Sequence, residues 1–158
     1  MAEFFALMKF NVVGTSLSPL DIKDANQRVT SIQAKGIQPN LRFIAAPMEF
    51  IADSVKELVP FDSVFVFEAL HHAYDWRRAI ESSYSCIKPG GWMLICNEPN
   101  VLHTFVAYRG ARMTNTHEIG LSRSELVSHL KKVGFKRVKI VKNQLAFFVR
   151  THWIVAQR

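Results

Sequence analysis

Short apolar runs alternate with amphipathic segments along the chain. Runs of strand length occupy residues 11–14, 41–45, 63–67 and 92–96. The last two are apolar almost throughout, as in strands that are buried on both faces of a parallel sheet. We therefore expect four strands, with longer segments connecting them.

Helix signals fill several of these connections. Ser18 precedes a proline, Asp75 precedes an apolar stripe, and Ser122 is followed three residues later by Glu125, as in a capping box. Glycine or a Lys-Pro-Gly-Gly run stands at the far end of each segment. The signals predict helices that start after Ser18, Asp75 and Ser122 and end before Gly36, Lys88 and Gly134.

The remaining segments are less regular. Residues 2–10 have the pattern of a helix, 46–60 leave room for a short one, and 97–121 are expected to be irregular. Two final strands are expected at about 137–142 and 146–156. The short turn predicted between them at Asn143 and Gln144 requires these two strands to be antiparallel.

Strands that alternate with helices indicate an α/β fold. We expect one domain over residues 1–158, with a mostly parallel sheet and one antiparallel strand near the C-terminus. In such sheets ligands bind outside the carboxyl ends of the strands, so residues that follow each strand are the first candidates for a site.

Composition narrows the class of protein. The chain has 158 residues, of which 49% are hydrophobic and 21% charged, the balance of a globular domain. No apolar run reaches the ~20 residues of a membrane span, and the start lacks the features of a signal peptide, so we expect a cytoplasmic protein. Cys86 and Cys96 stand apart and are expected to be core residues rather than a disulfide or zinc ligands.

Positive charge is concentrated near the C-terminus. Residues 1–122 contain 11 Lys and Arg against 12 Asp and Glu, whereas residues 123–158 contain 9 against one. Such a segment is either a solvated basic face or a surface that attracts nucleic acid, anionic lipid or an acidic partner.

Several motifs together resemble one family. Residues 61–72 (FDSVFVFEALHH), the IKPGG at 87–91 and the VGF at 133–135 are similar to the fourth strand, the turn before the fifth strand and the turn into the sixth strand of class I S-adenosylmethionine (SAM) methyltransferases that act on small molecules. Residues 12–19 resemble that family's second strand and the start of its next helix. The resemblance covers nearly all of the chain and implies a Rossmann-like methyltransferase fold.

The chain also departs from the family pattern. Residues 2–10 resemble the helix that follows the glycine-rich SAM loop, so we expect an N-terminally truncated domain without the first strand and that loop. Ser16 stands where the family usually has an acidic residue for the ribose, and Pro47 where an acidic residue meets the adenine. Each lost hydrogen bond costs about 1 kcal/mol, so the resemblance implies SAM as cofactor but weak binding.

The resemblance also implies a set of site residues. Ser16, Phe67, Glu68 and Ala69 would contact the cofactor. His71 and His72 would be catalytic, with His72 the better candidate for a general base on a hydroxyl or amine. Alternatively, Glu68 and one histidine only hold the loop or pair with Arg77 or Arg78.

Residues 97–121 contain candidates for contacts with a substrate. Tyr108, Arg109 and His117 could orient a polar or anionic small molecule, because long irregular connections often cover active sites. An ordinary surface loop is the other interpretation.

Two further chemistries have weaker signals. No HxxxH or HExxH spacing occurs, and His71 and His72 would point to different sides of an extended chain, so no metal site is expected.

Residues 14–18 partly resemble the nucleophile elbow of α/β hydrolases, with Ser16 as nucleophile, but Ser18 replaces the closing glycine.

Three functions follow from these observations. The first is a SAM-dependent methyltransferase with a small-molecule substrate, and the second is a non-catalytic remnant of that fold used in binding or assembly. The third, least supported, is nucleic-acid binding through the basic residues Arg123, Lys131, Lys132, Lys136, Arg137, Lys139 and Lys142.

The missing strand would lie in the middle of the sheet, between residues 11–14 and 63–67. Because unpaired strand edges promote association, we expect either a homo-oligomer in which a second copy fills the gap or direct pairing of these two strands.

Overall fold

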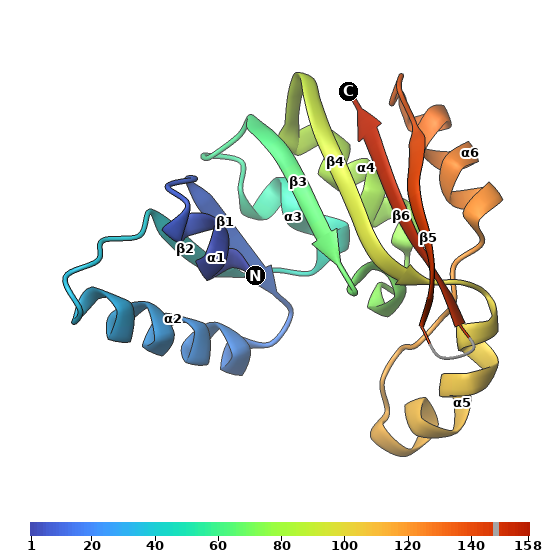
Figure 1. Ribbon diagram of the computed structural model, residues 1–158, viewed down its shortest axis with the longest axis horizontal. Helices are drawn as coiled ribbons and strands as arrows, with labels where there is room; N and C mark the ends of the chain where they lie inside the picture. The colour runs from blue at the N-terminus through green and yellow to red at the C-terminus, as the bar shows by residue number, and fades with distance from the viewer. Residues whose placement is uncertain (147–148) are drawn as a thin grey trace. The chain divides into compact units, whose positions relative to one another are not determined.

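The computed structural model describes residues 1–146 and 149–158. The chain divides into two compact units, Met1–Met48 and Glu49–Arg158, which are described separately (Figure 1). The expectation of a single domain stays a prediction. None of the described helices combines the length and the apolar character that crossing a bilayer requires.

The first unit is a parallel strand pair with two helices. In chain order it contains α1 (Ala2–Leu7), β1 (Val12–Ser16), α2 (Pro19–Gln33) and β2 (Leu41–Ala45). The strands pair in register from Val12 opposite Leu41 to Ser16 opposite Ala45. As predicted, Ser18 caps α2, because its hydroxyl accepts a hydrogen bond from the backbone N–H of Asp21.

The second unit contains a four-stranded sheet. In chain order its elements are η1 (Met48–Phe50), α3 (Ile51–Ser54), β3 (Phe61–Phe67), η2 (Leu70–His72), α4 (Trp76–Cys86), β4 (Ile87–Pro99), α5 (Leu102–Thr114), α6 (Arg123–Val133), β5 (Lys139–Ala146) and β6 (Val149–Gln157). The strand order is β3-β4-β6-β5. Only β6 runs against its neighbours in this sheet. The predicted α/β class with one antiparallel strand near the C-terminus is confirmed.

Helices α3, α4 and α6 lie along one face of this sheet (Figure 1). Asp75 caps α4 by accepting hydrogen bonds from the N–H groups of Arg77 and Arg78, and Ser122 caps α6, both as predicted. The core contains fully buried aliphatic side chains from the helices and the central strands. They include Ile80, Met93, Ile95, Leu126, Leu130 and Ile154. Cys86 and Cys96 are free and buried, as predicted.

Two local predictions are wrong. Residues 97–121 are not irregular throughout, because α5 occupies Leu102–Thr114. No residue of α5 is buried, so its apolar residues do not form the one-sided pattern that marks a packed helix. Asn143 and Gln144 do not form a turn but continue β5, opposite His152 and Thr151 of β6.

The strand pairing is described within each unit. Among the described residues, β1 pairs with β2 and β3 pairs with β4, in two separate sheets. Direct pairing between β1 and β3, which belong to different units, stays a prediction. Completion of the sheet by a second copy stays a prediction.

Candidate functional site

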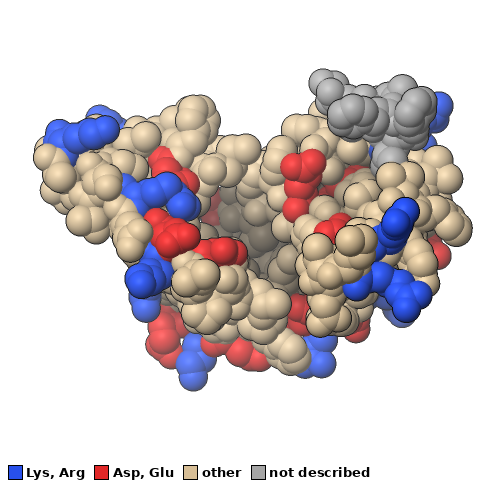
Figure 2. All heavy atoms as spheres, turned by 90° about the horizontal axis from the view of Figure 1, so that it is seen from below, with Lys and Arg blue, Asp and Glu red and all other residues tan. Residues whose placement is uncertain are grey.

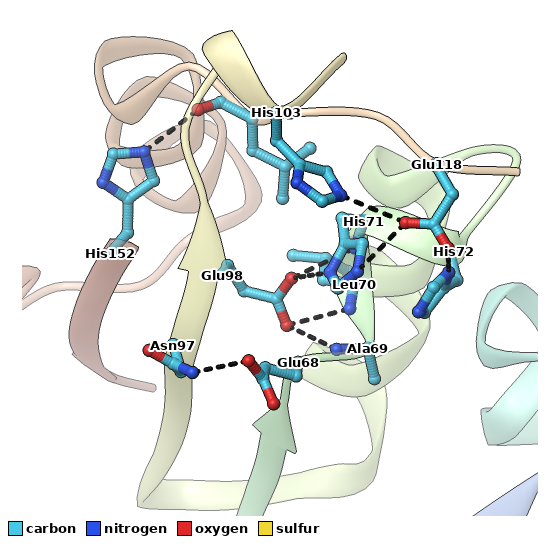
Figure 3. A network of polar contacts seen from close by, with 12 residues as sticks. Glu68, Ala69, Leu70, His71, His72, Asn97, Glu98, His103, Glu118 and His152 are labelled. Atoms are coloured by element: carbon cyan, nitrogen blue, oxygen red, sulfur yellow. Dashed lines mark hydrogen bonds and ion pairs between the residues drawn. The ribbon is translucent and has the colours of Figure 1, made fainter. Parts of the chain in front are cut away.

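The site is built where β3 ends and the chain turns into η2. Glu68 and Asn97 both have positive φ, 47° and 59°, at the ends of the apolar runs of β3 and β4. The Glu68 N–H donates to the Cys96 carbonyl at 3.1 Å, and the Asn97 amide donates to the Glu68 carboxylate at 2.6 Å. These contacts join the carboxyl ends of the two strands (Figure 3).

One buried carboxylate holds the turn that follows. Glu98 is 0% exposed and accepts hydrogen bonds from the backbone N–H groups of Ala69, Leu70 and His71 at 2.8, 2.9 and 3.1 Å. It also lies 2.8 Å from His71 Nδ1 (Figure 3). A carboxylate only accepts, so in the neutral imidazole of His71 the proton lies on Nδ1 and the lone pair on Nε2. Glu98 thus fixes both the backbone of η2 and the orientation of one imidazole.

A second carboxylate faces the histidines. Glu118 Oε2 lies 3.6 Å from His71 Nε2 and 3.1 Å from His103 Nε2, and its Oε1 lies 3.3 Å from His72 Nδ1. The rings of His71 and His72 are 4.0 Å apart. We call His71, His72, His103 and Glu118 the histidine cluster (Figure 3).

Backbone contacts bring Glu118 to this place. The N–H of Ile119 donates to the His71 carbonyl at 3.2 Å, and the N–H of Leu121 donates to the Pro99 carbonyl at 2.8 Å. Gly120 lies so close to the backbone of Asn100 that a β-carbon there would collide with its carbonyl. Glycine at this position therefore lets residues 117–121 run against the end of β4.

Burial shifts the pKa of two groups beside the cluster. The pKa of His152 is lowered, mainly by burial, although the bond from Nε2 to the Leu121 carbonyl opposes that shift. Burial and the charge of Glu98 raise the pKa of the Cys96 thiol to about 11. Cys96 therefore stays protonated near neutral pH and is a poor nucleophile.

The structure brings most of the predicted residues of this unit together. Phe67, Glu68 and Ala69 lead directly into η2, where His71 and His72 lie. The His117 carbonyl is 3.1 Å from His72 Nδ1, and its ring stacks on Tyr74 at 4.7 Å. The roles predicted for these residues stay predictions.

Tyr108 and Ser16, two other predicted site residues, bond to residues close to them in the sequence. Tyr108 and Arg109 are exposed on α5, and the Tyr108 hydroxyl accepts a 3.4 Å hydrogen bond from Arg112 on the same helix. In the first unit, the Ser16 hydroxyl donates to the Asp21 carboxylate at 2.8 Å and accepts from the Ser18 N–H. Ser16 thus helps to start α2, and a carboxylate lies beside it.

Two arguments from the sequence need correction. Arg77 bonds Glu125 at 2.8 Å and Arg78 lies over the Phe50 ring, so neither pairs with Glu68, His71 or His72 among the described contacts. The argument against a metal assumed an extended chain at His71 and His72. That assumption is wrong, because the 3₁₀ turn of η2 places the two rings side by side.

Sequence reasoning missed Glu98 and Asp21. Glu98 lies two residues after the apolar run 92–96. A single acidic residue so close to a buried strand could have indicated a buried carboxylate that accepts hydrogen bonds at the carboxyl end of that strand. Asp21 lies in the first turn of α2, and its contact with Ser16 depends on the geometry of the cap, which the sequence does not show.

Some basic residues of the C-terminal segment have structural roles. Lys131 and Lys132 lie in the last turn of α6, where positive charge meets the negative end of the helix dipole. Lys and Arg are interspersed with Asp and Glu on the face shown in Figure 2. Nucleic-acid binding stays untested.

Comparisons with known proteins agree with this fold. The methyltransferase domain family matches residues 1–95, and no curated protein sequence matches significantly. A SAM-dependent methyltransferase from Methanosarcina mazei has 16% identity and a TM-score of 0.73, with 100% of this chain and 86% of that one covered.

Two further solved structures have the same fold. Magnesium protoporphyrin IX methyltransferase from Synechocystis PCC 6803, with bound S-adenosylhomocysteine (SAH), has 14% identity and a TM-score of 0.71, covering 99% of this chain and 68% of that one. An arsenic(III) SAM methyltransferase from Chlamydomonas reinhardtii has 18% identity and a TM-score of 0.74, covering 93% of this chain but only 54% of its own. With a family match over more than half of its length and this shared fold, the chain belongs to the methyltransferase domain family, in the class I SAM-dependent group.

Proposed function

We propose that this protein transfers the methyl group of SAM to a small polar molecule, with His72 as the general base. The observation that carries the proposal is the Glu98 network, which fixes η2 at the carboxyl end of β3. Ligands of open α/β sheets bind at that end of the strands. A rigid turn there supports catalysis because reacting groups must be held in place before the reaction starts.

His72 has the accessibility and the hydrogen bonding of a base. Its side chain is 45% exposed, in contrast to the 8% of His71. The His117 carbonyl, which only accepts, lies 3.1 Å from Nδ1 and therefore favours a proton on that nitrogen. Nε2 then keeps the lone pair that would take a proton from a hydroxyl or amine of the acceptor.

The chain also offers an acceptor group suited to the cofactor. SAM supplies an electrophilic methyl group when bound, and its ribose hydroxyls need hydrogen-bond acceptors. Ser16 replaces the usual acid, but the Asp21 carboxylate lies 2.8 Å from its hydroxyl. The Ser16–Asp21 pair could therefore accept hydrogen bonds from the ribose hydroxyls, with the Asp21 carboxylate as the stronger acceptor.

Calorimetric titration with SAM and SAH tests the cofactor assignment. We expect binding by the wild-type protein and about 10-fold weaker binding by Asp21→Asn, the loss of one charge-assisted hydrogen bond. Asp24→Asn, on the same helix, is the matched control and should bind like wild type. No binding by the wild type at millimolar ligand would favour the alternative of a non-catalytic fold used in binding or assembly.

Methyl transfer from labelled SAM to a panel of small alcohols, phenols and amines tests the base. We expect His72→Gln to lower kcat by about 10²–10⁴-fold with little change in KM. A panel member methylated equally fast by His72→Gln would contradict the assignment of His72.

A further inference from the structure

We propose that His71, His72 and Glu118 form a binding site for a divalent transition metal, best matched by Zn²⁺. One ligand atom from each of these three side chains lies within 4.8 Å of the other two. His71 Nε2 and His72 Nδ1 are the ring nitrogens that face the Glu118 carboxylate. Two imidazole nitrogens and one carboxylate oxygen are a known ligand set of zinc sites that keep one position open.

The separations suit a tetrahedral ion. Zinc bonds to nitrogen and oxygen of about 2.0–2.1 Å at tetrahedral angles place neighbouring ligand atoms about 3.3 Å apart. His71 Nε2 and His72 Nδ1 lie 3.6 and 3.3 Å from the two oxygens of Glu118. Both separations are close to that value, so each nitrogen can share an ion with a carboxylate oxygen of Glu118.

The surroundings of His71 are those of a metal ligand. Histidine ligands usually donate their second ring N–H to a carboxylate or carbonyl, which sets the tautomer and the direction of the free nitrogen. Glu98 fills this role for His71, at 2.8 Å from Nδ1 and 0% exposed. The same carboxylate also bonds three backbone N–H groups, so the nitrogen that faces Glu118 is fixed by the fold.

His103 supports the third ligand. Its Nε2 lies 3.1 Å from Glu118 Oε2, which orients the carboxylate towards η2. The side chains of His103, Glu118 and His72 are 25%, 20% and 45% exposed, so an ion can enter from solvent. Nitrogen donors favour Zn²⁺, Co²⁺ or Ni²⁺ over Mg²⁺ and Ca²⁺, which prefer all-oxygen sites.

Metal binding and the base role of His72 are alternative states of the same residue. A metal on Nδ1 replaces the proton that the His117 carbonyl favours, and it draws η2 and residues 117–121 together through Glu118. Zn²⁺ is therefore expected to inhibit methyl transfer if the proposed function holds. Metal binding itself does not depend on that function, and it is measured without any substrate.

The test is titration of the full, chelator-treated chain with Co²⁺, followed by displacement with Zn²⁺. We expect the visible absorption bands of tetrahedral cobalt, saturation at one equivalent, and loss of the bands on addition of Zn²⁺. Replacement of a ligand, in His72→Gln or Glu118→Gln, should abolish the bands. His103→Gln should weaken binding by about 10–100-fold, the usual effect of losing a residue that orients a ligand.

Matched controls separate metal binding from loss of folding. His129→Gln and Glu125→Gln remove one histidine and one glutamate of the same unit that contact Arg77 rather than the cluster, and both should bind Co²⁺ as wild type does. Circular dichroism of each variant checks its fold. The proposal is wrong if the wild type gives no tetrahedral cobalt spectrum and does not compete for Zn²⁺ with a chromophoric chelator. It is also wrong if folded His72→Gln and Glu118→Gln keep the spectrum.

Discussion

The helices η2 and α5 follow neighbouring strands of the same sheet, and they differ in how they are held. In η2, after β3, Leu70 and His71 are 1% and 7% exposed, and the backbone is bonded by Glu98. In α5, after β4, no residue is buried, and Phe105 and Met113 are each 79% exposed. Side chains that must contact a ligand in one fixed geometry need a buried, hydrogen-bonded backbone like that of η2. This contrast favours η2 rather than α5 as the location of the chemistry.

The largest expected effect comes from removing the group that holds η2. Glu98→Ala leaves two buried backbone N–H groups, one part-buried N–H group and one imidazole without their acceptor, and it should lower the free energy of unfolding by about 3–5 kcal/mol. Urea denaturation measures this change. Glu125→Ala, at an exposed ion pair, is the control and should stay within about 0.5 kcal/mol of wild type. A loss below 1 kcal/mol for Glu98→Ala would mean that η2 is held by other contacts.

The segment that carries Glu118 allows a second test. Gly120→Ala forces a β-carbon against the Asn100 carbonyl and should destabilise the protein by about 1–3 kcal/mol. Gly110 on α5 has nothing within 4 Å of a built β-carbon, so Gly110→Ala should be neutral or stabilising by up to about 1 kcal/mol. Thermal melts of both variants give the comparison. Equal melting temperatures of the two variants would show that glycine at position 120 is not required for the close approach to the Asn100 backbone.

These two sites also show what the sequence could and could not predict. Caps such as Ser18, Asp75 and Ser122 were predicted correctly because a cap bonds backbone two or three residues away. The apolar runs of β3 and β4 also predicted the sheet, and with it the carboxyl ends of the strands where ligands bind. This signal is local too, because a strand that is buried on both faces has an uninterrupted apolar sequence.

Contacts between distant segments were not predictable in this way. Glu98 bonds residues 27–29 positions earlier, and Glu118 meets His71 and His72 across more than forty residues of chain. Helix α5 was not predicted because none of its residues is buried and because Thr104, Val106 and Gly110 are weak helix formers.

A smaller effect should come from pH, through His152 beside the cluster. Its pKa in the folded state lies below the ordinary value of 6.5, mainly because of burial, with Arg123 also lowering it and the Leu121 bond and Glu98 opposing. Below pH 6.5 the unfolded chain therefore binds a proton that the folded chain does not. His152 therefore makes its whole contribution to the free energy of unfolding above pH 6.5. That contribution decreases as the pH falls towards the pKa of His152 in the folded state.

The structure gives the reason that His152 resists protonation. Its Nε2 bonds the Leu121 carbonyl, whereas its buried Nδ1 has no hydrogen-bond partner among the described residues. A proton on Nδ1 would be buried without an acceptor. Urea midpoints measured between pH 7.5 and 5 should fall less in His152→Gln, which keeps a donor for Leu121. The same pH dependence in the variant and the wild type would assign the effect to other groups.

The smallest effect is expected on α5. Phe105→Ser removes a large apolar side chain that is 79% exposed, so the free energy of unfolding should change by no more than about 0.5 kcal/mol. The cobalt spectrum should also be unchanged, because no described contact of Phe105 reaches the histidine cluster. If Phe105→Ser destabilises the protein by 2 kcal/mol or more, the Phe105 side chain must be covered in solution. Sedimentation at several protein concentrations would then show whether a second copy covers it, as expected for a homo-oligomer.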